Sequence, residues 1–148
     1  MKFISAEEFL EQPKEVQKVF IDWWNPSIGD LYLNTPGNRE DFEQIVDVIY
    51  SKELANDAYN NKNCNMKESR GDYFPLLTEG QLRKFIEDKT GCYIDISHNS
   101  MDTCIQLCDK EDEYPIGEWE WQYLSNDLLQ AYWKVAIEIA SKIGSEEK

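Results

Sequence analysis

Four side chains that commonly bind zinc fall within 17 positions: Cys92, His98, Cys104 and Cys108. Structural zinc sites usually pair cysteines two to four residues apart in tight turns. Cys104 and Cys108 instead flank a predicted strand, where their even spacing puts both on one face about 13 Å apart, at a rise of ~3.3 Å per residue. One ion cannot bridge that gap, so we predict no metal site and interpret the cysteines as small buried hydrophobes.

Side chains suited to catalysis do not form a recognisable pattern. His98 is the only histidine, and its neighbours Ser97 and Ser100 are too close in sequence to imply a triad, which is defined by spatial geometry. Acid pairs like those of a glycosidase could come from Glu87 and Asp88 or from residues 109–113, but a charge run is more typical of a solvated loop. The chain has no glycine-rich phosphate-binding motif. We predict that it is not an enzyme and needs no cofactor.

Acidic and aromatic residues are interleaved in the segment that ends at Trp121. Residues 102–120 contain seven acids and one base, Lys110. Because aromatic residues are enriched in binding hot spots, this pattern is a candidate recognition surface for a basic partner. The alternative is a half-buried strand with aromatics facing the core and acids facing water. The candidate partner-binding residues are Asp109, Glu111, Asp112, Glu113, Tyr114, Glu118, Trp119, Glu120 and Trp121.

Helix-start signals and apolar stripes predict four helices. The capping box at residues 5–8 opens a short helix, and Pro13 begins a second. A second capping box, at residues 78–81, opens a central helix that Gly91 ends. Asn126 is the expected N-cap of a long last helix, whose apolar stripe runs through residues 128–143.

Period-2 patterns predict a small sheet. Strands are expected at residues 31–33, 93–96, 103–107 and 119–123. Residues 42–50 fit either a helix or a strand, and their β-branched content favours a strand that pairs with residues 31–33. Residues 53–72 are polar and resemble a long mobile loop. The resulting fold class is α+β, with a small, mostly antiparallel sheet and helices packed on one face, in a single domain of residues 1–148.

The composition describes a folded, strongly acidic chain. It has 41% apolar residues, five Trp, eight Tyr and six Phe, and a net charge of −14. Such a charge repels nucleic-acid phosphate and attracts a basic protein surface. The alternative is that the charge serves solubility alone. With no apolar run of ~20 residues and an acidic N-terminus, we expect a cytoplasmic protein that binds neither membranes nor nucleic acid directly.

Three segments carry a family resemblance. Residues 74–91, residues 127–140 and Trp23-Trp-Asn-Pro-Ser-Ile-Gly-Asp-Leu-Tyr32 resemble small phage and prophage proteins of clostridia and related Firmicutes. This family has no established activity, so no functional residue is carried over from it. The resemblance implies a phage-encoded accessory protein that acts in the host cytoplasm.

Together these observations favour a non-catalytic protein that binds a basic surface of a host protein. One such role is inhibition of a host defence nuclease by acidic mimicry of DNA, as anti-CRISPR and anti-restriction proteins do. An alternative is a sponge or sensor for a small molecule or nucleotide, with a pocket lined by Trp23, Trp24, Trp119 and Trp121. A third alternative is a metal-dependent enzyme that uses acidic residues.

Overall fold

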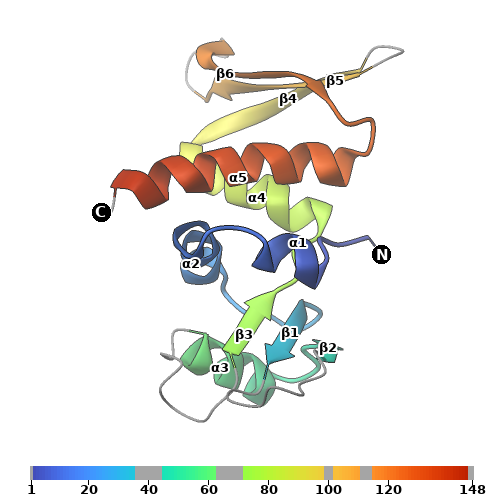
Figure 1. The fold of residues 1–148 in the computed structure, drawn as a ribbon, viewed down its shortest axis with the longest axis vertical. Helices are drawn as coiled ribbons and strands as arrows, with labels where there is room; N and C mark the ends of the chain where they lie inside the picture. Colours follow the sequence, from blue (N-terminus) through green and yellow to red (C-terminus); the bar gives the residue numbers. More distant parts are fainter. Residues whose placement is uncertain (1, 36–44, 63–71, 99–101, 111–114, 147–148) are drawn as a thin grey trace. The chain divides into compact units, whose positions relative to one another are not determined.

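A computed structural model describes residues 2–35, 45–62, 72–98, 102–110 and 115–146. Within them the chain has the predicted α+β architecture, with five helices and two three-stranded antiparallel sheets (Figure 1). The chain divides into two compact units. Unit 1 contains residues 1–4 and 77–148, and unit 2 contains residues 5–76. A single domain over residues 1–148 stays a prediction.

Unit 1 is a sheet with two helices on one face (Figure 1). Its sheet has the order β4-β5-β6 and all neighbours are antiparallel. The helices α4 and α5 contact the strands from one side, as the fold-class prediction required. The elements are α4 (Glu79–Thr90), β4 (Cys92–His98), β5 (Thr103–Asp109), β6 (Pro115–Leu124) and α5 (Leu128–Glu146).

Helix termini in unit 1 follow the sequence signals closely. Thr78 and Gln81 form the predicted capping box, and Gly91 ends α4 in the left-handed conformation at φ 69°. The N-cap prediction for α5 was wrong by one residue. Asp127, rather than Asn126, accepts a hydrogen bond at its Oδ1 from the Leu129 N–H at 3.0 Å. An aspartate can cap a helix as well as an asparagine, so their order along the chain could not decide between them.

The long helix α5 supplies much of the core of unit 1. Its predicted apolar stripe is buried except at its two ends, where Leu128 and Ile143 are half-buried, and the helix packs against β5 and β6. Facing it, β4 contributes Cys92 and Ile94, and β5 contributes Ile105 and Leu107. The buried stripe of α5 is formed by Leu129, Ala131, Tyr132, Trp133, Val135, Ala136, Ile139 and Ala140.

Unit 2 is a second small sheet with the order β2-β1-β3 and antiparallel pairing throughout. On one side, the rings of Phe9 and Phe74 lie 5.7 Å apart, and Phe20 lies 6.3 Å from Phe9. On the other side, Tyr32 belongs to a cluster with Trp24, Ile49 and Ala58. The elements are α1 (Ala6–Leu10), α2 (Lys14–Trp23), β1 (Leu31–Thr35), β2 (Ile45–Val48), α3 (Lys52–Asn61) and β3 (Asp72–Pro75).

Unit 2 departs from the sequence prediction in three respects. The strands β1, β2 and β3 form a second sheet, whereas the sequence predicted one sheet for the whole chain. The predicted loop over residues 53–72 is wrong at both ends, because Lys52–Asn61 is α3 and Asp72 begins β3; residues 63–71 lie outside the described part. Pro13 is the N-cap of α2 rather than its first helical residue. The preferred strand for residues 42–50 is confirmed for Ile45–Val48, which pairs with β1.

Candidate functional site

The sheet of unit 1 has one face that α4 and α5 do not cover, which we call the outer face. Strand alternation sends the buried residues of β4 and β5 toward the helices and the intervening residues to the other side. Tyr93 is 51% exposed there, and Asp95 is exposed beside its pairing partner Gln106. The outer face consists of Tyr93, Asp95, Ser97, Cys104, Gln106, Cys108, Glu120 and Gln122.

A hydrogen-bond network positions the Glu120 carboxylate on the outer face. Glu120 Oε1 accepts from Gln122 Nε2 at 2.9 Å and from Cys104 Sγ at 3.8 Å. Hydrogen bonds from Gln122, then Gln106 and Cys104, lower the pKa of Glu120. Donors that favour the charged form keep a carboxylate ionised. Glu120 is therefore a fixed negative charge on an open sheet face.

The predicted partner-binding residues do not all lie on this face. Glu120 pairs with Gln106 on the outer face, whereas Trp121 pairs with the buried Ile105. Trp121 is half-buried, and its indole N–H donates to a Glu138 carboxylate oxygen from α5. For Glu120 and Trp121 the alternative interpretation of the sequence was therefore correct: the acid faces water and the aromatic faces the helices.

The other predicted partner-binding residues are placed only in part. Asp109 is half-buried at the end of β5, opposite Cys92. Glu118 and Trp119 belong to β6. Outside the described residues lie Glu111, Asp112, Glu113 and Tyr114.

Sequence reasoning missed Tyr93 as the aromatic residue of the outer face. Lys110 Nζ lies 5.7 Å from the centre of the Tyr93 ring, so this ring already accepts a cation. The signal was available, because Tyr93 and Asp95 alternate with the apolar Ile94 and Ile96. Alternation alone places Tyr93 with the acids and not with the core.

The four side chains that could have bound zinc are divided between the two faces of the sheet. Cys92 is buried on the helix side, as predicted, but the prediction of burial was wrong for Cys104 and Cys108, which are half-buried on the outer face. His98 is exposed at the end of β4, with Nδ1 3.2 Å from Thr103 Oγ1. Across the described residues, no three His, Cys, Asp or Glu side chains gather closely enough to hold one metal ion.

The tryptophans of the alternative pocket belong to different units. Trp23 and Trp24 lie in unit 2, and Trp119 and Trp121 lie in unit 1. Trp24 is buried, and its indole N–H donates to Asp30 Oδ2 at 3.0 Å. The Ser27 N–H donates to the same oxygen at 3.0 Å. The segment Trp23–Tyr32 thus builds the turn that joins α2 to β1.

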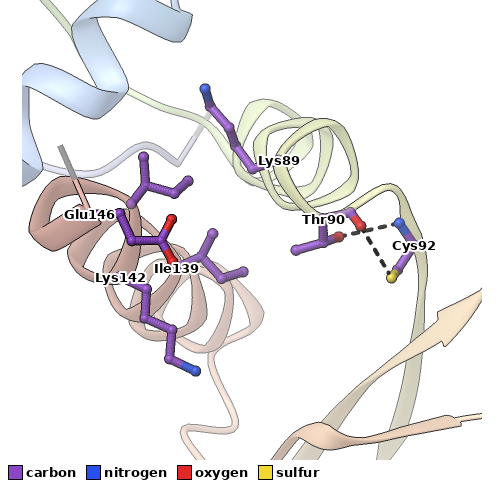
Figure 2. A pocket seen from close by; sticks show the side chains of 7 residues that line it. Lys89, Thr90, Cys92, Ile139, Lys142 and Glu146 are labelled. Carbon is purple, nitrogen blue, oxygen red and sulfur yellow. Dashed lines mark hydrogen bonds between the residues drawn. The ribbon is translucent and has the colours of Figure 1, made fainter.

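A pocket of about 300 Å³ opens in unit 1 beside the last turns of α5 (Figure 2). Its size is at the lower end for ligand sites. Thr90 Oγ1 donates to the Ile86 carbonyl at 2.7 Å, and Cys92 Sγ donates to the Thr90 carbonyl at 3.4 Å. Figure 2 shows the ammonium ends of Lys89 and Lys142 pointing away from each other. The pocket therefore lacks convergent polar groups, and its lining contains no tryptophan: Lys89, Thr90, Cys92, Ile139, Lys142, Ile143 and Glu146.

Comparison with known proteins finds no matching family model, no matching curated protein and no matching solved structure. The resemblance to phage and prophage proteins therefore stays a prediction from the three quoted segments. Of the helices in the described residues, none combines the length and the apolar character needed to cross a bilayer.

Proposed function

We propose that this chain is a non-catalytic, phage-encoded binding protein that engages a basic surface of a host protein. The outer face of the unit 1 sheet is the contact surface. The observation that carries the proposal is the Glu120 carboxylate, which hydrogen bonds from Gln122 and Cys104 orient on a face that also exposes Asp95 and Tyr93. Two carboxylates and an accessible aromatic ring suit Lys and Arg side chains.

Inhibition of a defence nuclease is the specific role that we propose within this function. A nuclease that binds DNA presents Lys and Arg to phosphate. Glu120 and Asp95 offer negative charge at fixed positions on a sheet, and the chain as a whole carries −14. Acidic residues on such a surface can compete with DNA for the same cationic residues. The partner should then be released by DNA and by salt.

Charge reversal on the outer face tests the proposal. The immobilised chain is exposed to a clostridial lysate, and captured proteins are identified and quantified by mass spectrometry. We expect the variant Asp95→Lys/Glu120→Lys to lose a basic, DNA-binding protein that the parent captures. The matched control, Glu11→Lys/Glu53→Lys, makes the same charge change at exposed positions of unit 2. Equal loss in both variants would mean that only net charge matters, and no loss in either would contradict the proposed surface.

A further inference from the structure

Apolar side chains are concentrated on the surface of unit 2 around the strand β2. The exposed fractions are 59% for Ile28, 49% for Val46, 40% for Val48 and 74% for Tyr50. Two backbone hydrogen bonds hold this region together: Gly29 N–H donates to the Ile49 carbonyl at 2.8 Å, and Ile49 N–H donates to the Asp30 carbonyl at 2.9 Å. Ile28 thus lies beside the end of β2. Exposed apolar groups gathered in one place mark interaction surfaces more often than scattered ones do.

Among the described residues, β2 is also an edge strand of its sheet, in the order β2-β1-β3. The Ile49 N–H donates to the Asp30 carbonyl, so alternation makes the next pair along the ladder, Leu31 and Val48, a non-hydrogen-bonded pair. The backbone N–H and C=O groups of Val46 and Val48 therefore point away from β1. The Val48 N–H confirms this direction, because it donates at 2.8 Å to the carboxylate of the exposed Asp47. Asp47 Oδ1 thus accepts from an N–H to which a carbonyl of an added strand could bind instead.

Side chains along β2 alternate in chemistry. Val46 and Val48 lie on one side of the strand, and Asp47 lies on the other, beside Tyr32. The edge therefore presents apolar groups on one side and a carboxylate on the other.

We propose that the edge of β2 binds an extended segment of the partner in which apolar residues alternate with Lys or Arg. The added strand pairs with Val46 and Val48 through its backbone, as in other strand-addition complexes. Its apolar side chains cover the two valines. Its cationic side chains pair with the Asp47 carboxylate. Asp47 then releases the Val48 N–H, which can donate to a carbonyl of the added strand. This inference rests on the proposed function in taking the partner to be a basic protein, and it adds a second surface.

Charge argues against a second copy of this chain at the same edge. Two β2 strands in antiparallel contact would bring two Asp47 carboxylates together on chains that each carry −14. A basic segment reverses the sign of that interaction. The alternating apolar and cationic pattern follows from the period of two in any extended strand.

Three synthetic hexapeptides test the proposal: one alternates Lys and Val, one alternates Lys and Ser, and one alternates Glu and Val. Binding is measured by amide NMR shifts and by calorimetric titration. We expect only the Lys–Val peptide to bind, with shifts concentrated at residues 45–50. The variant Val46→Thr/Val48→Thr keeps β-branched shape and strand preference, and should weaken binding roughly tenfold, which is about 1.4 kcal/mol. Asp47→Asn should weaken it by removing the charge while keeping an oxygen acceptor for Val48.

Controls separate this edge from the outer face of unit 1. Tyr93→Ser and Asp95→Lys/Glu120→Lys should leave the affinity for the Lys–Val peptide within about twofold, since substitutions that share no partners with a site do not couple to it. Equal binding of the two Lys peptides, or shifts located mainly in unit 1, would overturn the proposal. So would a dimer that Val46→Thr/Val48→Thr abolishes, because a second copy would then occupy the edge. Unchanged lysate capture by Asp95→Lys/Glu120→Lys, together with intact peptide binding, would count against the outer face alone.

Discussion

Lys62 shows how one residue can organise a unit. It is buried, 8% exposed, and its ammonium donates to the Asp22 carbonyl at 3.3 Å and to the Trp24 carbonyl. Its Nζ also lies 5.0 Å from the centre of the Tyr59 ring. Burial lowers the pKa of Lys62, and Asp22 opposes that shift. The carbonyls at the end of a helix lack partners within it, so a cation from another element can stabilise them.

Replacing Lys62 should therefore cost stability. Lys62→Met keeps the aliphatic stem but leaves the Trp24 carbonyl without this donor. We expect a loss of about 1–3 kcal/mol in the free energy of unfolding, the usual cost of an unsatisfied buried group. The control is Lys52→Met at an exposed position of α3, which should change stability by less than about 0.5 kcal/mol. Urea denaturation checks both, and equal effects would show that the hydrogen bonds of Lys62 are unimportant.

At the scale of elements, helices with a capping motif or a wide apolar stripe were predicted correctly from the sequence. A helix with almost no apolar stripe was missed. The capping box of α4, its terminal Gly91 and the stripe of α5 each determine an element without help from the rest of the chain. In contrast, α3 buries only Ala58 among its residues, so its sequence carries almost no helical stripe. The N-cap Ser51 accepts from the Leu54 N–H at 3.1 Å, and this was the one local signal available.

The candidate site was predictable only where side chains alternate between the two faces of a single strand. A strand at residues 119–123 correctly implied that Glu120 and Trp121 face opposite sides, but composition could not say which side is covered. That depends on where α5 lies, which is a long-range property. The network around Glu120 also joins two different strands, because Cys104 and Gln106 come from β5 and Gln122 comes from β6. No spacing rule within one segment identifies such a set.

The buried stripe of α5 leads to a direct test of the core. Leu129→Ala should destabilise the protein by about 2–5 kcal/mol, because it removes a large side chain from a packed interior. Leu128→Ala is the matched control, since Leu128 is the neighbouring leucine and is only half-buried. Its smaller burial should give a clearly smaller loss. Chemical denaturation of both variants measures the difference, and a loss below about 1 kcal/mol for Leu129→Ala would contradict the burial.

At the scale of the whole molecule, the negative charge is divided equally between the two units. Residues 5–76 contain fourteen acids and seven bases, and the remainder contains fifteen acids and eight bases. Each unit therefore carries −7. Net charge cannot indicate which unit binds a basic partner, and the local arrangement of carboxylates has to decide. The fixed Glu120 in unit 1 and the edge residue Asp47 in unit 2 are the two arrangements that we propose.

Stability should fall as the pH rises above about 9. Burial raises the pKa of Tyr32, Tyr73 and Tyr132 above the ordinary 10.0, and that of Cys104 and Cys108 above 9.0. As pH rises, the unfolded chain loses these protons first, so it binds fewer protons than the folded chain and the free energy of unfolding decreases. Lys62 acts oppositely, since its lowered pKa favours the folded chain as pH approaches 10.5. Five groups lower the stability of the folded chain at high pH and one group raises it, so we expect a net loss of stability.

Urea midpoints at pH 7, 8.5 and 10 measure this loss, and salt separates its two sources. The rising negative charge adds repulsion, which 0.5 M salt should largely screen, because the Debye length then falls below about 8 Å. The part due to buried tyrosines should persist in salt. Tyr32→Phe should reduce that persistent part, whereas Tyr59→Phe, at an exposed position, should not. A midpoint that stays constant or rises between pH 7 and 10 would show that burial of these hydroxyls and thiols does not control the alkaline stability.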